Sequence, residues 1–342
     1  MDCCHSKKRP WYRNNILLLA MALLLLMALS ALFPVLIPFR ENLIMYFKVI
    51  WWAVVLGLFL GGLIERFVPE RYISHVLARH KKRTIFYSVL MGFFASTCSH
   101  GILALSMQLH KKGASTSAVV AFLLASPWAN LPLTLMLIGF FGMAKALYIV
   151  LVAIVIALTT GMVFQWMEHH HFVERNKKSL EYDAAFSIGK DIKKRFRNYH
   201  LSAEQVKNDL AGIFRGALGL ADMILWWTLI GLALASLAGA YVPSGIFQHY
   251  MGPTFLGMLV TLGVATVIEV CSEGTAPLAF EIFRQTGALG NSFVFLMAGV
   301  ATDYTEIGIL WQNIGRRTAI LLPVITVPQI LFWGVIANSI FK

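Results

Sequence analysis

Long apolar runs separated by short polar segments dominate the pattern of this chain. The runs, each about twenty or more residues long, cover 16–38, 45–67, 85–109, 115–141, 145–167, 217–241, 254–283, 290–311 and 318–341. An α-helix of that length can cross the roughly 30 Å of hydrocarbon in a bilayer. The pattern therefore predicts an all-α, polytopic membrane protein.

The composition agrees with a membrane location. Of 342 residues, 58% are hydrophobic and only 13% are charged, whereas the surface of a soluble domain of this size needs far more charge. The net charge of +12 comes mainly from basic residues between the apolar runs, as is typical of cytoplasmic loops. We therefore expect a multi-pass protein of the cell (inner) membrane, with the lipid bilayer and no nucleic acid as a partner.

Basic segments divide the chain into parts. Lys7, Lys8 and Arg9 precede the first apolar run and indicate a cytoplasmic N-terminus. That run resembles a signal peptide but is too long for one, so we expect an uncleaved helix. The expected parts are a cytoplasmic tail (1–15), a first transmembrane helix (16–38), a first membrane repeat (45–167), a basic cytoplasmic loop (168–215) and a second membrane repeat (217–341).

The two membrane parts match each other in sequence. Cys98-Ser99-His100-Gly101 recurs as Cys271-Ser272-Glu273-Gly274, and Asn130 matches Asp303 at the same offset (271 − 98 = 303 − 130 = 173). Agreement at several landmarks with one offset indicates an internal duplication.

Loop charges favour an inverted arrangement of the two repeats. The segments 71–83 and 168–215 are both basic and should both be cytoplasmic, yet three apolar runs separate them. One of the runs 85–109 and 115–141 should then be a re-entrant hairpin, although the charges do not tell which. The alternative is a conventional bundle of about nine full crossings.

Four polar breaks interrupt apolar runs near their centres, at 96–101, 126–132, 269–277 and 299–305. Half-helices that meet at the midplane build the binding sites of many transporters, although proline and glycine are also common in ordinary membrane helices. The residues expected to break the helices are Gly101, Pro127, Pro132, Gly274, Pro277 and Gly299.

Ionisable side chains gather at these breaks. Buried carboxylates are costly in a bilayer, and desolvation with mutual repulsion favours their protonated form, as a proton carrier requires. The candidates for proton coupling are Glu269, Glu273, Asp303 and Glu306; for Glu306, a residue near a helix end that reaches toward the membrane surface is an equal alternative. Thiolates and imidazole suit soft or borderline metal ions, although a cysteine in a membrane helix is commonly a packing residue.

The doubled motif also resembles a known family. In each half it is followed by a helix, a basic turn that ends in glycine (Lys111-Lys112-Gly113 and Arg284-Gln285-Thr286-Gly287) and a break similar to Ala-x-Pro-x-x-Asn. With these features the chain resembles, from about 49 to 341, the ArsP-like predicted permeases, which include organoarsenical efflux permeases. His100 and Glu273 stand where the usual Cys-Ser-Cys-Gly motif of the family has its second cysteine, which favours a cation or a proton-coupled substrate over an all-thiolate arsenic site.

The sequence therefore predicts a secondary-active permease for a small inorganic or organometalloid species, with efflux favoured and no cofactor. The expected substrate-binding residues are Cys98, His100, Asn130, Cys271, Glu273 and Asp303. Of these, Cys98, His100, Cys271 and Glu273 are the candidate metal ligands. The alternatives are an intramembrane metal- or thiol-dependent enzyme and an ion channel, and a homo-oligomer is an open option.

Overall fold

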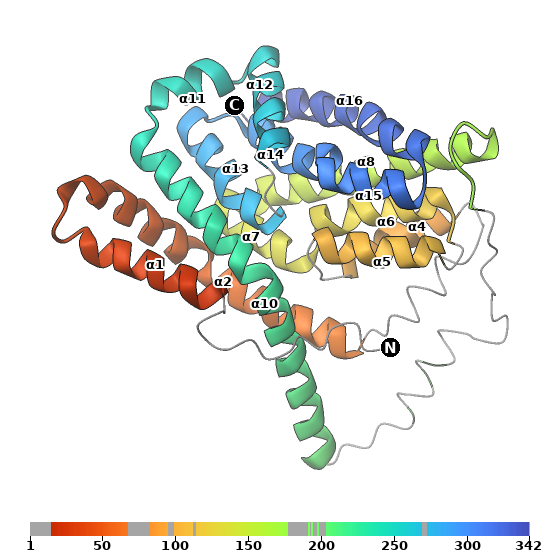
Figure 1. Ribbon diagram of the computed structural model, residues 1–342, viewed down its shortest axis with the longest axis horizontal. Helices are drawn as coiled ribbons and strands as arrows, with labels where there is room; N and C mark the ends of the chain where they lie inside the picture. The colour runs from red at the N-terminus through yellow and green to blue at the C-terminus, as the bar shows by residue number, and fades with distance from the viewer. Residues whose placement is uncertain are drawn as a thin grey trace.

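The computed structural model describes residues 15–67, 83–94, 99–111, 114–176, 203–268 and 272–341, together with positions 191, 193 and 197. Every regular element in this part of the chain is a helix, which confirms the predicted all-α class (Figure 1). The first half contains α1 (Asn15–Leu29), the 3-10 helix η2 (Pro34–Leu36), α2 (Ile37–Phe67), α4 (Thr84–Phe94), α5 (Ser99–Lys111), α6 (Thr116–Ala129), α7 (Leu131–Phe141) and α8 (Met143–His169). The second half contains α10 (Ala203–Tyr241), α11 (Ser244–Met251), α12 (Phe255–Val267), α13 (Ser272–Thr286), α14 (Leu289–Thr302), α15 (Tyr304–Asn313) and α16 (Arg316–Ile340).

The helices repeat with the offset found in the sequence. The starts of α5 and α13 lie 272 − 99 = 173 residues apart, and those of α6 and α14 lie 289 − 116 = 173 apart. The pairs α7 with α15 and α8 with α16 keep the same offset (304 − 131 = 316 − 143 = 173). The two halves are therefore built from the same succession of helices.

Two boundaries differ from those expected. The first helix, expected at 16–38, ends at Leu29, and Pro34 opens η2 before α2 begins at Ile37. Proline is favoured in the first turn of a helix, where its missing N–H would have no partner within the helix. The 15 residues of α1 reach only about 22 Å. The basic loop, expected at 168–215, gives way to helix at Ala203, because α10 extends well ahead of its apolar part.

The two ends of the bundle can be named by residues that meet there. We call one end the arginine end, after Arg316 and Arg317 at the start of α16. There, Thr318 N donates a hydrogen bond to Glu174 Oε2 (2.9 Å), and Thr116 Oγ1 donates to the carbonyl of Glu174 (2.7 Å). At the C-terminal end, Gly290 N donates to Asn338 Oδ1 (2.6 Å). The arginine end thus unites the starts of α6 and α16, and the C-terminal end unites the start of α14 with the end of α16.

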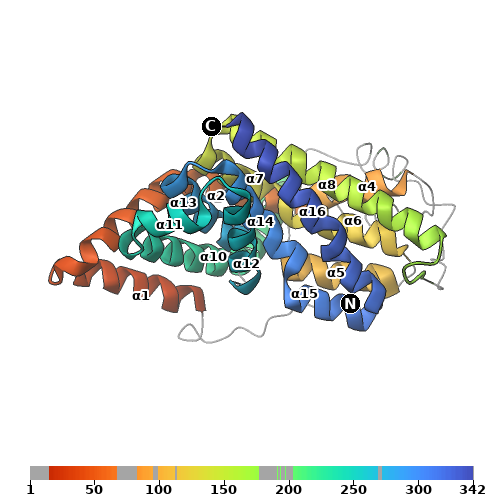
Figure 2. The ribbon, with the colours of Figure 1, turned by 90° about the horizontal axis from the view of Figure 1, so that it is seen from above.

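The corresponding helices α8 and α16 lie side by side and run antiparallel (Figure 2). Tyr148 OH near the start of α8 donates to the carbonyl of Trp333 (2.9 Å). Farther along α8, Thr160 Oγ1 accepts a hydrogen bond from Gln329 Nε2 (3.0 Å), one turn earlier in α16. Two helices that correspond in sequence therefore point in opposite directions.

The helices α2 and α10 form a second antiparallel pair. Arg66 near the end of α2 makes an ion pair with Asp209 near the start of α10 (2.9 Å), and Tyr241 OH at the end of α10 donates to the carbonyl of Val35 (2.9 Å). The 39-residue α10 bends by 42° near its middle, and its first turns extend beyond the bundle (Figure 1).

In the first half, α4 and α5 occupy only the arginine-end part of the bundle. A Cβ on Gly161 would touch both Ile85 at the start of α4 and Ala121 of α6, and a Cβ on Gly92 would lie 2.9 Å from Ala125 Cβ, deeper along α6. In contrast, α5 ends beside the start of α6, since only four residues separate them. With these directions, the run 85–109 begins and ends at the arginine end of the bundle.

In the second half, α12 and α13 occupy only the part of the bundle near the C-terminal end. Asn291 Nδ2 near the start of α14 donates to the carbonyl of Gly252, ahead of α12 (3.0 Å). The hydroxyl groups of Thr266 near the end of α12 and Thr302 at the end of α14 lie 2.8 Å apart. Because α13 then returns to the start of α14, the run 254–283 begins and ends at the C-terminal end of the bundle.

Several helices of the described chain have the length and apolar composition of membrane spans. They are Pro34–Leu63, Met143–His169, Leu289–Asn313 and Arg316–Ile340. The pair α6 and α7, which bends by 41°, meets the same criteria when it is taken as one span. A bundle of this kind agrees with a multi-pass membrane protein.

Candidate substrate site between the two halves

Glu273 and Asn130 meet across the two halves at two of the predicted breaks. Asn130 Nδ2 donates a hydrogen bond to Glu273 Oε1 (3.2 Å), and Ser272 Oγ donates to Glu273 Oε2 (3.0 Å). Neither the side chain of Glu273 nor that of Asn130 is more than 1% exposed. A carboxyl group is thus held in the interior by neutral donors from both halves.

The break at Asn130 follows from its own hydrogen bonds. Its backbone is extended (φ −67°, ψ 156°), and its Oδ1 accepts a hydrogen bond from Leu133 N (2.8 Å), so that the side chain caps α7. Asp303 does the same for α15, because its Oδ1 accepts from Glu306 N (3.4 Å). Asparagine and aspartate are favoured as N-caps, and here they stop one helix and start the next at equivalent positions.

Two glycines let the long helices approach this contact closely. A Cβ on Gly231 of α10 would lie 2.1 Å from the carbonyl oxygen of Gly274, next to Glu273. A Cβ on Gly57 of α2 would lie 2.9 Å from Pro132 Cα, two residues after Asn130. The pair formed by α2 and α10 therefore covers the Asn130–Glu273 contact.

If each helix is replaced by its counterpart in the other half, the contact of α7 with α13 corresponds to one of α15 with α5, which also contact each other. His100 is the second residue of α5, as Glu273 is of α13, and Asp303 caps α15 as Asn130 caps α7. In the described part of the chain, α2 makes no comparable contact with α5, nor α10 with α15. The two equivalent places therefore differ in both their side chains and their covering helices.

Several expected site residues lie outside the described residues, namely Cys98, Glu269 and Cys271, and for His100 only the backbone is described. Of the expected site residues, Asn130 and Glu273 are in contact with each other, whereas Asp303 and Glu306 lie at the start of α15. Glu306 is only 2% exposed, which disagrees with a side chain that reaches the membrane surface. Among the described residues, no group of three or more potential metal ligands is found.

The residues expected to break helices mostly lie inside them. Pro127, Pro277 and Gly299 are in the interiors of α6, α13 and α14, and the glycines of the doubled motif, Gly101 and Gly274, are the third residues of their helices. Proline is tolerated within membrane helices when neighbouring groups satisfy the freed carbonyl. Pro132 alone of the six stands as expected beside a break, in the first turn of α7.

Comparison with known proteins supports a transport function. A family of predicted permeases matches residues 41–339, which is most of the chain. The chain belongs to this ArsP-like permease family. The protein YcgR of Bacillus subtilis is 23% identical over 79% of this chain and 86% of its own length.

Two further relatives are more distant or shorter in their match. A Streptococcus mutans protein named as a subunit of a two-component membrane permease complex is 19% identical over 73% of this chain and 78% of its own. The protein YraQ of Escherichia coli is 26% identical over 36% of each chain. No solved structure matches this permease.

A second buried carboxylate of the permease was not predicted from the sequence. Glu281 of α13 is 1% exposed and accepts hydrogen bonds from Tyr46 OH of α2, from Arg284 Nε and Nη2 (both 2.8 Å) and from Gln285 Nε2 (2.6 Å). The first half has Gln108 at the equivalent position (281 − 173 = 108). The sequence signal that could have identified Glu281 is its position inside an apolar run, three residues before Arg284.

At each end of the permease, a side chain near the end of one helix caps the start of another helix of the same half. At the arginine end, Glu168 Oε2 of α8 accepts hydrogen bonds from Ser117 N (3.3 Å) and Ser117 Oγ (2.8 Å) at the start of α6. At the C-terminal end, Asn338 of α16 accepts from Gly290 N at the start of α14 and donates to Asn291 Oδ1 (3.0 Å). The first cap is a carboxylate and the second is an amide.

Proposed function

We propose that this chain is a secondary-active permease that exports a small thiophilic metal or metalloid species in exchange for protons. The observation that supports this most is the Asn130–Glu273 contact, in which a fully buried carboxyl joins two interrupted elements of different halves. A carboxyl group in such a place can hold a proton or a cation but not both. An exporter that moves its substrate in exchange for protons needs a group that binds a proton and the substrate in turn.

The substrate ligands in this proposal are the two cysteines of the doubled motif. Cys98 and Cys271 immediately precede the first residues of α5 and α13, and thiolates suit soft ions. Glu273, two residues after Cys271, would release its proton when the substrate leaves. His100 would act at the equivalent position of the other half.

The mechanism we propose is alternating access by inverted repeats. The antiparallel pairs α8 with α16 and α2 with α10 support an inverted relation of the halves. In the observed arrangement α2 packs against α7 and α10 against α13. Exchange of the two halves gives a second arrangement in which α10 packs against α15 and α2 against α5, so that the other end of the bundle opens.

Transport by protein reconstituted in lipid vesicles tests the function. Uptake of trivalent arsenicals, antimonite and Cd²⁺ into inside-out vesicles should increase when the vesicle interior is acidic. Glu273→Gln should abolish the stimulation by the pH gradient, and Cys98→Ala and Cys271→Ala should each reduce flux at least tenfold, an order-of-magnitude value for loss of a good ligand. Glu204→Gln, in the first turn of α10, is the matched control.

Full flux in all three site variants would contradict the proposal. The absence of any flux with every probe, from protein that is folded and inserted, would exclude a thiophilic substrate. Flux rates beyond those of carriers would favour a channel. A zinc ion bound in stoichiometric amount and not exchangeable would favour an enzyme.

A further inference from the structure

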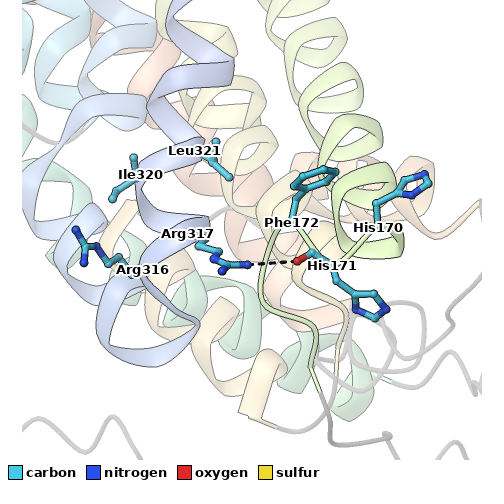
Figure 3. Close-up of a pocket in the computed structure, with 7 residues that line it drawn as sticks. All are labelled: His170, His171, Phe172, Arg316, Arg317, Ile320 and Leu321. Atoms are coloured by element: carbon cyan, nitrogen blue, oxygen red, sulfur yellow. Dashed lines mark hydrogen bonds between the residues drawn. The ribbon is translucent and has the colours of Figure 1, made fainter.

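A cavity of about 700 Å³ opens at the arginine end, between the end of α8 and the start of α16 (Figure 3). Two kinds of side chain line it. The polar side chains are two arginines and two histidines, Arg316, Arg317, His170 and His171. The apolar walls are formed by Phe172, Ile320 and Leu321. The cavity lies far along α8 from the Asn130–Glu273 contact, and neither of these two residues lines it.

Neither arginine has a carboxylate partner in the described part of the chain, and Arg317 points toward His171 whereas Arg316, at the rim, points away from it (Figure 3). Arg317 Nη1 donates to the carbonyl of His171 (3.4 Å) across the opening (Figure 3), and Arg316 stacks on the ring of Trp311 (5.2 Å). His171 has a left-handed backbone (φ 59°), which turns the chain after α8. The guanidinium groups thus remain available for an anion.

Glu174, the nearest described carboxylate, is engaged elsewhere. It accepts hydrogen bonds from Arg317 N (2.9 Å), Thr318 N (2.9 Å) and Thr318 Oγ1 (2.8 Å), and so caps α16. Partial burial alone would raise the pKa of Glu174, but these hydrogen bonds outweigh it and hold the pKa below its usual value. The carboxylate therefore caps the helix terminus, and no ion pair between it and either guanidinium group is found among the described residues.

The apolar surroundings continue from the cavity along the outside of the bundle. Trp166 stacks on Phe172 (5.9 Å between centroids), and both rings are more than half exposed. Met162 of α8, one turn before Trp166, and Val324 of α16, about one turn after Leu321, are also more than half exposed. Tryptophan is typical of the membrane interface, so a ligand here has charge at one end and hydrocarbon at the other.

We propose that this cavity binds the headgroup phosphate of an acidic phospholipid, with the acyl chains along α8 and α16. Arginine matches phosphate with several donors at once, and basic pockets between membrane helices on the cytoplasmic side bind acidic lipids in this way. Apolar walls next to the charges distinguish the site from one for free phosphate.

Native mass spectrometry of the full-length protein in detergent tests this. Phosphatidylglycerol should bind as one molecule per chain and more tightly than phosphatidylcholine with the same acyl chains. Arg316→Gln combined with Arg317→Gln should weaken the phosphatidylglycerol complex about 30-fold, the value for two basic residues at an anionic membrane surface. The control, Arg83→Gln with Arg215→Gln, removes the same charge from exposed positions elsewhere and should retain binding.

A third variant separates lipid from free anion. Phe172→Ala keeps both arginines and should weaken phosphatidylglycerol without changing the affinity for inorganic phosphate. Displacement of the lipid by equimolar inorganic phosphate would show a free-anion site instead, and equal loss in the control pair would show a diffuse charge effect. Equal binding of both lipids would also overturn the proposal. Thermal unfolding of each variant checks that its fold is intact.

Discussion

The two equivalent places at the midplane share their backbone plan but differ in what surrounds them. At the first, Asn130 and Glu273 are in contact, and α2 and α10 pack over them through Gly57 and Gly231. At the second, α5 contacts α15, which Asp303 caps, and the described parts of α2 and α10 make no comparable contact there. A duplicated fold can thus hold two sites that are alike in geometry and unlike in chemistry and access.

This difference has a physical cause. A pair of long helices can pack against only one of two equivalent surfaces at a time. The surface that is covered is excluded from water, and the other is accessible to the pair only after the two halves shift. We interpret the asymmetry as one end state of a transport cycle.

Cross-linking gives the largest expected effect, because it is all or none. A Cβ on Gly139 would lie 3.9 Å from Ala53 Cβ, within the range for a disulfide, so Ala53→Cys with Gly139→Cys should form one and stop transport. In the second arrangement, in which α10 packs against α15, the counterpart of Ala53 is Trp227 (53 + 174, the offset between Gly57 and Gly231). The counterpart of Gly139 is Gln312 (139 + 173). Their cysteine pair should cross-link only during turnover, as mapped by mass spectrometry of peptides.

The parent protein with only its native cysteines is the control for this experiment. Full transport by the protein locked between positions 53 and 139, with no cross-link between 227 and 312 under any condition, would contradict the exchange of contacts.

Enlarging the close-packed glycines should destabilise the covered site. Gly231→Ala would place a Cβ 2.1 Å from a backbone oxygen, whereas the Cβ of Gly57→Ala would meet Pro132 at 2.9 Å. Overpacking of this kind costs about 1–3 kcal/mol, so we expect thermal unfolding in detergent at a lower temperature for both, with Gly231→Ala the more affected. Gly263→Ala, whose Cβ meets nothing within 4 Å, should not lower it. Equal midpoints for all three would refute the close packing.

The two caps at the ends allow a smaller comparison. Glu168→Ala and Asn338→Ala each remove an N-terminal cap, which costs about 1 kcal/mol. Glu168→Gln gives the arginine end the neutral type of cap found at the C-terminal end, and should cost only about 0.5 kcal/mol from the lost charge at a helix terminus. Chemical denaturation measures all three. A Glu168→Gln variant as unstable as Glu168→Ala would mean that the charge, and not the geometry, maintains this cap.

Acid should produce the smallest effect, at Glu174. Because its pKa is lowered in the folded protein, its contribution to stability is complete above the pKa of an unfolded glutamate, about 4.3, and is lost as the pH falls through the folded value. The difference in thermal midpoint between the parent and Glu174→Gln should therefore be constant from pH 7 to 5 and shrink below pH 4. A difference that grows with acid would contradict the hydrogen-bonded carboxylate.

The sequence by itself determined the all-helical membrane class, the repeat offset and the approximate positions of the two breaks that the structure describes, before α7 and before α15. These follow from local signals, since apolar run length and a recurring motif need no knowledge of distant contacts. The offset of 173 residues was already visible in Cys98 and Cys271, and the helix starts reproduce it. Glu273 was selected because a carboxylate is costly inside a membrane, and Asn130 because it matches Asp303 at the repeat offset.

Only the tertiary structure decided which residues interrupt the helices and which runs turn back. Pro127 was expected to break a helix, but α6 continues to Ala129 because the break is made by the side chain of Asn130, whose cap is a short-range hydrogen bond. The runs that return to the same end of the bundle are recognised by packing between α4 and α6 and between α12 and α14, contacts distant in sequence. Glu281 escaped notice for the same reason, since Tyr46, which hydrogen-bonds its carboxylate, lies 235 residues away.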